Sequence, residues 1–134
     1  MAALAHTFSK VGIIGVGLIG GSLGLAMRRT GFDGRIVGVS RPATVEAAIS
    51  LGAIDAGFDY DAVDEALGDA DLVFVCSPIQ HIIGFLPRVM AAVPSGALVT
   101  DAGSTKRRIV AAAAATGRTD AWFLGGPPMA GSEK

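Results

Sequence analysis

The chain has 134 residues, enough for one domain with a core, and 51% are hydrophobic, which excludes an intrinsically disordered protein. The formal net charge of -1 predicts no nucleic-acid partner, and no metal site or membrane partner is expected either. The single Cys76 excludes an internal disulfide and fits a reducing compartment. Because residues 1–10 also lack the features of a signal peptide, we expect the cytoplasm.

The first predicted element is a short apolar run, Lys10–Ile14, of the kind that a buried parallel strand needs. It is followed by Gly15, Gly17 and Gly20, spaced G-x-G-x-x-G, and by an apolar stretch, Leu18–Arg29, that predicts a helix. In such a unit the first glycine permits the tight turn and the second lets a pyrophosphate approach the backbone. The third lets the helix lie close to the strand.

The start of this helix is a candidate phosphate site. Its free N–H groups and the helix dipole favour negative charge, so Leu18 and Ile19 join the glycines as candidate cofactor-binding residues. Two alternatives are a glycine-rich turn without a ligand and a membrane helix. The uncharged run Val11–Met27 is a little short of the ~20 residues that a spanning helix needs, and its glycines lie where a strand must turn.

The remaining chain alternates between apolar runs and helical stretches. The expected strands are Arg35–Val39, Asp71–Cys76, Ala97–Thr100 and Ala121–Leu124. The expected helices are Pro42–Leu51, a short one around Ala62–Leu67, one after Pro78 that ends near Val93, and Thr105–Thr116. This alternation predicts the α/β class: a doubly wound parallel sheet of the Rossmann dinucleotide-binding type, as one domain over residues 1–134.

The end of the second strand bears on the choice of cofactor. A carboxylate usually binds the ribose 2′-hydroxyl of NAD at this place, but here the strand ends in Ser40 and Arg41. A serine followed by an arginine can bind a 2′-phosphate, so we favour NADP over NAD. The alternative is that Arg41 points to water.

Two further loops lie where ligands bind such sheets, beyond the carboxyl ends of the strands. Cys76 is expected to be a small core residue, while Ser77 and Pro78 shape their loop against the cofactor. His81 is expected at the surface, with a proton acceptor as the alternative. In the loop after the next strand, Ser104 is the candidate for contacting substrate and nicotinamide, and it or its neighbour also suits a helix N-cap.

Four segments together resemble the nucleotide-binding half of prephenate and arogenate dehydrogenases. They are Gly15–Leu23, Val37–Arg41, Asp101–Lys106 and Pro128–Glu133. The resemblance implies NAD(P)-dependent oxidative decarboxylation of prephenate or arogenate in tyrosine biosynthesis. Hydride goes to the nicotinamide, a base takes the hydroxyl proton, and loss of carbon dioxide makes the ring aromatic. It also implies that Ser104 lies beside substrate and nicotinamide, as a catalytic residue.

The chain departs from this family in two places. The histidine that accepts the proton in the family falls at Pro127, which has no acid–base group. The family also continues into a helical domain that forms the dimer, whereas this sequence ends at Lys134, so we expect a truncated dinucleotide-binding domain. The alternatives are a non-catalytic dinucleotide-binding module and a related reductase of imines or β-hydroxy acids.

Overall fold

The sheet organises the computed structural model, which describes residues 8–76, 79–101 and 120–124. Six strands, all parallel, lie in the order β3-β2-β1-β4-β5-β6. Their bounds are β1 Lys10–Ile14, β2 Arg35–Val39, β3 Ala56–Phe58, β4 Leu72–Val75, β5 Leu98–Asp101 and β6 Trp122–Leu124. This order is that of a Rossmann sheet, so the predicted fold class is confirmed.

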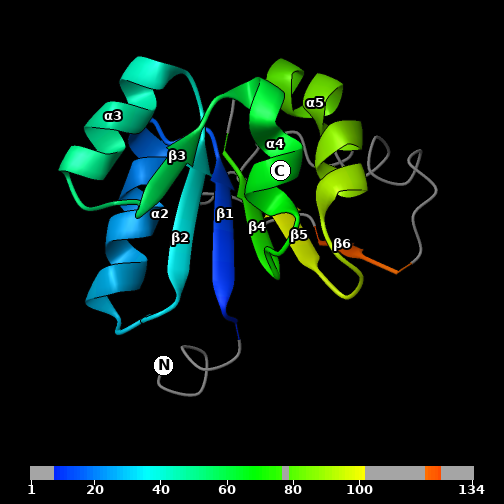
Figure 1. Ribbon diagram of the computed structural model, residues 1–134, viewed down its shortest axis with the longest axis horizontal. Coiled ribbons are helices and arrows are strands. Elements are labelled where there is room, and N and C mark those ends of the chain that lie inside the picture. The colour runs from blue at the N-terminus through cyan, green and yellow to red at the C-terminus, as the bar shows by residue number, and fades with distance from the viewer. Residues whose placement is uncertain (1–7, 77–78, 102–119, 125–134) are drawn as a thin grey trace, which may run out of the picture.

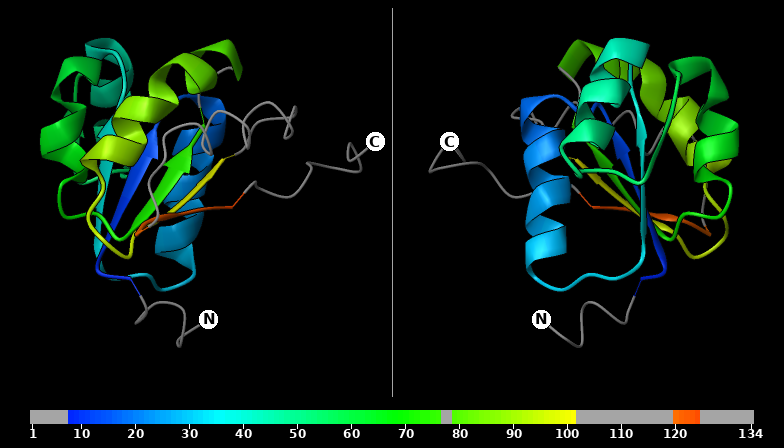
Figure 2. Two further views of the ribbon diagram at one scale, coloured as in Figure 1. Left: turned by 90° about the vertical axis from the view of Figure 1, so that its right-hand side faces the viewer. Right: turned by 60° about the vertical axis from the view of Figure 1, so that its left-hand side comes forward.

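Helices cover both faces of the sheet. They are α2 Leu18–Arg29, α3 Pro42–Ser50, α4 Val63–Leu67, which follows a 3₁₀ turn at Tyr60–Ala62, and α5 Ile79–Ala92. Figures 1 and 2 show α2 on one side of the strands, with α4 and α5 on the other. In the part of the chain that the structure describes, no helix is long and apolar enough to cross a membrane.

Two apolar clusters, one on each face, hold the helices to the strands. Successive side chains of β1 point to opposite faces of the sheet and so enter different clusters. Ile13 packs into the cluster that also contains Leu25 of α2 and Val45 of α3. Ile14 packs into the opposite cluster, with Leu67 of α4 and Leu86 of α5. Both isoleucines are at most 1% exposed, which explains why the strands read as continuous apolar runs.

The predicted elements agree with the structure except at a few boundaries and at β3. The sequence does not predict β3, whose residues Ala56–Phe58 are half-buried and paired with β2. Strand β5 lies one residue later than predicted, so Asp101 ends the strand and is not part of the loop. Strand β4 is one residue shorter at each end, and the predicted helix Thr105–Thr116 lies outside the described residues.

Candidate functional site

The carboxyl ends of the four central strands form one edge, where the predicted site loops begin. Ile14 of β1 pairs with Val39 of β2 and with Val75 of β4, and Val75 pairs with Asp101 of β5. The strand order reverses between β1 and β4, which is where such sheets bind ligands. Cys76 lies at this point, because its N–H donates to the Ile14 carbonyl at 2.8 Å.

The glycine turn has the geometry that a dinucleotide requires. Gly15 has a φ of 85°, in the left-handed region that favours glycine. A Cβ on Gly20 would lie 2.1 Å from the Gly15 carbonyl oxygen, so the helix approaches the turn as closely as only glycine permits. Gly17 is the N-cap of α2, and a Cβ built on it would meet nothing within 4 Å. The open space above Gly17 therefore fits an approaching phosphate.

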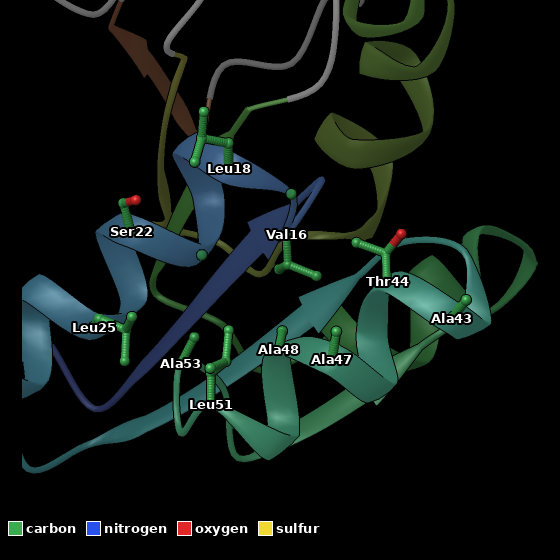
Figure 3. Close-up of a pocket in the computed structure, with 12 residues that line it drawn as sticks. Val16, Leu18, Ser22, Leu25, Ala43, Thr44, Ala47, Ala48, Leu51 and Ala53 are labelled. Atoms are coloured by element: carbon green, nitrogen blue, oxygen red, sulfur yellow. The ribbon is translucent and has the colours of Figure 1, made fainter.

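Beside this turn, a groove of about 460 Å³ runs between α2 and α3. Figure 3 shows its walls, with Val16, Leu18, Ser22 and Leu25 on one side and residues of α3 on the other. Among the described residues, its lining is apolar apart from the hydroxyls of Ser22 and Thr44 and includes neither a cation nor a carboxylate. A phosphate at its mouth would therefore depend on the backbone N–H groups of α2 and on charges outside the groove.

At the end of β2, Ser40 and Arg41 have contrasting environments. Ser40 is only 5% exposed, and its hydroxyl has no hydrogen-bond partner among the described residues. A buried hydroxyl without a partner costs free energy, which a ligand at this edge would recover. Arg41 is exposed at the N-cap of α3, with Pro42 in the first turn. A buried hydroxyl beside an accessible guanidinium suits a ribose that carries a phosphate.

At the end of β4, Cys76 is half-buried and packs against the cluster on the α2 face. Burial raises the pKa of its thiol to about 12, and the charge of Asp101 adds to this rise. The thiol is therefore protonated near neutral pH, which supports the prediction of a packing residue over a reactive one.

Asp101 itself is a site residue that the sequence places only in a loop. It is 4% exposed at the end of β5. The sequence contains one signal that could have indicated this burial, namely that Asp101 directly follows the strand residues Leu98–Thr100. If the strand extends by one residue, Asp101 becomes part of it and is buried. Thr44, which shares the groove with Gly17, is also absent from the predictions, because one threonine in a helix carries no distinctive pattern.

Several predicted residues lie outside the part of the chain that the structure describes. These are Ser77, Pro78, Ser104 and Pro127. His81 lies in the first turn of α5, as predicted, but its side chain is outside the described part. The described candidates Gly15, Gly17, Leu18, Ile19, Gly20, Ser40 and Arg41 all follow β1 or β2 at the same edge of the sheet.

Comparison with known proteins agrees with this arrangement. Residues 23–134 match the family described as the nucleotide-binding domain of prephenate dehydrogenase. The chain belongs to this family. The chain is 35% identical over 127 residues to the prephenate dehydrogenase of Lactococcus lactis subsp. cremoris, a match that covers 93% of the chain and 35% of the relative. The chain thus spans about a third of the length of the curated relatives that it matches.

Solved structures give the same family. The prephenate dehydrogenase of Aquifex aeolicus, in complex with hydroxyphenyl propionate and NAD+, superposes with a TM-score of 0.81 at 34% identity. That match covers 94% of this nucleotide-binding domain and 43% of the Aquifex chain. The Synechocystis arogenate dehydrogenase gives a TM-score of 0.72 at 33% identity, over 87% of this chain and 39% of its own. The predicted resemblance is therefore confirmed.

Proposed function

We propose that the chain is the cofactor-binding domain of an NAD(P)-dependent dehydrogenase that oxidatively decarboxylates prephenate or arogenate in tyrosine biosynthesis. The observation that carries this proposal is the contrast within the glycine turn. Gly20 is packed against the Gly15 carbonyl, while Gly17 faces open space. The N–H groups of Leu18 and Ile19, at the start of α2, have no partner within the helix and suit a pyrophosphate.

The same edge favours NADP over NAD. No acid follows β2, where a carboxylate would bind the 2′-hydroxyl of NAD and would repel a 2′-phosphate. In its place, the Ser40 hydroxyl can donate to the phosphate and the exposed Arg41 guanidinium can pair with it. Arg41 extends from the N-terminus of α3, whose dipole also favours an anion.

The chemistry of the whole enzyme is part of the proposal. The nicotinamide, when bound, accepts the hydride from the ring carbon that carries the substrate hydroxyl. Ser77 and Pro78 would border this cofactor, and Ser104 would contact substrate and nicotinamide. The homodimer would need the helical domain that the family has. We retain residues 1–134 as one dinucleotide-binding domain and the cytoplasm as the expected compartment.

The experiment compares NADPH and NADH by nucleotide fluorescence titration of the 134-residue chain. We expect NADPH to bind about ten-fold more tightly, because a charge-assisted contact to the extra phosphate is worth about 1.5 kcal/mol. Arg41→Ala should remove most of this difference. Arg35→Ala is the matched control, since Arg35 is also exposed but lies at the opposite end of β2. It removes the same charge and should leave the preference unchanged.

Each result bears on a different part of the proposal. Equal affinities, or tighter binding of NADH, would refute the NADP preference while leaving a dinucleotide site. An equal loss in Arg35→Ala and Arg41→Ala would show that net charge, and not a contact at the end of β2, produces the preference. If neither nucleotide bound at millimolar concentration, the dinucleotide-binding function itself would be wrong.

A further inference from the structure

The described core contains two buried polar side chains, and both belong to the site edge. They are Ser40, at 5% exposure, and Asp101, at 4%. Ser40 follows β2 and Asp101 ends β5, and each of these strands lies one place out from the switch between β1 and β4. Asp101 is level with Val39 in the strand register, so Ser40 lies one residue further along than Asp101. The two halves of the sheet thus each bury one polar side chain at the site edge, a neutral hydroxyl in one half and a carboxylate in the other.

The charge of Asp101 acts on the space between these halves. Its strand partner is Val75, which directly precedes Cys76 at the switch point. Burial is the main cause of the raised pKa of the Cys76 thiol, and the charge of Asp101 adds to it. Asp101 and Cys76 end adjacent strands at the switch, so the carboxylate lies close enough to act on a group of the neighbouring strand.

A dinucleotide on this sheet lies across the switch, with one nucleotide on each half. The proposed adenosine end lies at Ser40 and Arg41, after β2, so the nicotinamide end belongs to the half that contains β4 and β5. The oxidised nicotinamide ring carries a positive charge, and the reduced ring is neutral. The rest of the molecule is the same in both forms. A fixed charge near this end therefore distinguishes the two forms without any contact of its own.

We propose that Asp101 makes the site prefer the oxidised cofactor to the reduced one, as a residue that determines specificity for redox state. This inference rests on the proposed function, because it needs a nicotinamide at the β4–β5 half. For a dehydrogenase, such a preference aids the binding of oxidised cofactor in a cell that contains both forms, and it speeds release of the reduced product.

The size of the effect follows from Coulomb's law. One unit charge that acts on another across a partly solvated crevice contributes about 1 kcal/mol, which changes the ratio of the two dissociation constants about five-fold. By linkage, the same factor lowers the reduction potential of the bound two-electron couple by about 20 mV. Hydride acceptance thereby becomes slightly less favourable. The free energy released when the proposed substrate becomes aromatic is far larger than this loss.

The test measures the dissociation constants of NADP+ and NADPH by isothermal titration calorimetry, for the 134-residue chain and its variants. Asp101→Asn removes the charge with little change of shape and should weaken NADP+ about five-fold relative to NADPH. Asp101→Ser is a second neutral variant, for use if the first does not fold by circular dichroism. Asp101→Glu keeps the charge and should retain the parent ratio. Ser40→Ala is the matched control on the other half, and it should weaken both forms by the same factor.

A second readout needs no cofactor. If the field of Asp101 reaches the crevice, Asp101→Asn should lower the pKa of the Cys76 thiol, measured from the pH dependence of alkylation. An unchanged NADP+ to NADPH ratio in the neutral variants, with both forms still bound, would overturn this inference alone. So would an equal change in Asp101→Glu, because shape would then be responsible. Failure of the parent chain to bind either form would refute the proposed function, and this inference with it.

Discussion

The packing of helix α2 predicts that one substitution, glycine to alanine, has opposite effects on stability at neighbouring positions. A Cβ on Gly20 would lie 2.1 Å from the Gly15 carbonyl oxygen, and one on Gly24 would lie 2.2 Å from the Ala53 carbonyl oxygen. Both obstacles are backbone atoms, which cannot rotate away. On Gly21, which is in the same helix, the nearest atom is the Val16 carbonyl oxygen at 3.5 Å, an ordinary van der Waals contact.

The expected magnitudes combine two terms. Alanine stabilises a helix interior by about 1 kcal/mol relative to glycine. Overpacking against a fixed backbone costs about 3 kcal/mol. Gly20→Ala and Gly24→Ala should therefore each lower the free energy of unfolding by about 2 kcal/mol, which for a chain of this size lowers Tm by about 8 °C. Gly21→Ala has only the first term and should raise Tm by about 4 °C.

Thermal unfolding followed by far-ultraviolet circular dichroism, without nucleotide, measures these differences. Gly84→Ala is a control in another helix, because Gly84 is exposed in α5 and a Cβ there would meet nothing within 4 Å. It should be neutral or stabilising. If Gly20→Ala and Gly24→Ala were as stable as Gly21→Ala, the close approach of α2 to the turn and to Ala53 would be wrong. The explanation of the third glycine as a packing residue would then also be wrong.

Three further predictions concern charges and the thiol. With a pKa of about 12, Cys76 should react with iodoacetamide about a thousand-fold more slowly than free cysteine near pH 8, and its rate should rise steeply only towards pH 12; a rate like that of free cysteine would contradict its burial. The Asp55 carboxylate accepts a hydrogen bond from the Ile36 N–H of β2 at 2.8 Å and pairs with Arg28. Asp55→Ala should therefore lower the free energy of unfolding, measured in urea, by about 1–2 kcal/mol, and no change would show that both contacts are dispensable. The hydrogen bond from Lys10 lowers the pKa of Asp69, so this pair contributes above the ordinary carboxyl pKa and its contribution is lost as the pH falls through the lowered value. Because Asp69 is largely exposed, Asp69→Asn should cost less than about 0.5 kcal/mol at neutral pH, and a larger loss would reveal a contact beyond this pair.

Most of the fold could be predicted because its strands are buried on both faces. Short, largely apolar runs between helices, such as Lys10–Ile14 and Arg35–Val39, are typical of strands that are buried on both faces. The predicted bounds of both strands agree with the structure. Strand β3 could not be predicted in this way. It is only Ala56–Phe58, and it depends on tertiary contacts, namely pairing with β2 and the close approach of Val45 to Gly57. Neither contact leaves a local pattern in the sequence.

The candidate site was predictable where chemistry depends on spacing. Gly15, Gly17 and Gly20 have distinct tasks at fixed intervals, and the structure gives each the expected surroundings. Ser40 could be placed at the end of β2, but its burial could not be foreseen, because a serine there is equally compatible with an exposed turn. Asp101 was harder still, since aspartate is rarely buried and one residue of strand length decides whether it is in the core.

The distribution of polar side chains along the edge matches the parts of the proposed ligand. At the switch, β1 and β4 end in the apolar Ile14 and Val75, so the centre of the edge offers a ligand little besides backbone and glycine. A pyrophosphate needs just these, because it binds N–H groups at a helix start. One strand further out on each side, the core contains the hydroxyl of Ser40 and the carboxylate of Asp101, both at most 5% exposed. Buried polar groups break the rule that the rest of this core obeys, and such exceptions are expected where binding is selective. Nicotinamide dinucleotides differ from one another at their two ends. The 2′-phosphate on the adenosine ribose distinguishes NADP from NAD, and the charge of the nicotinamide ring distinguishes the oxidised form from the reduced form. The centre of the edge therefore suits many nucleotides, and in our proposal its two flanks select among them.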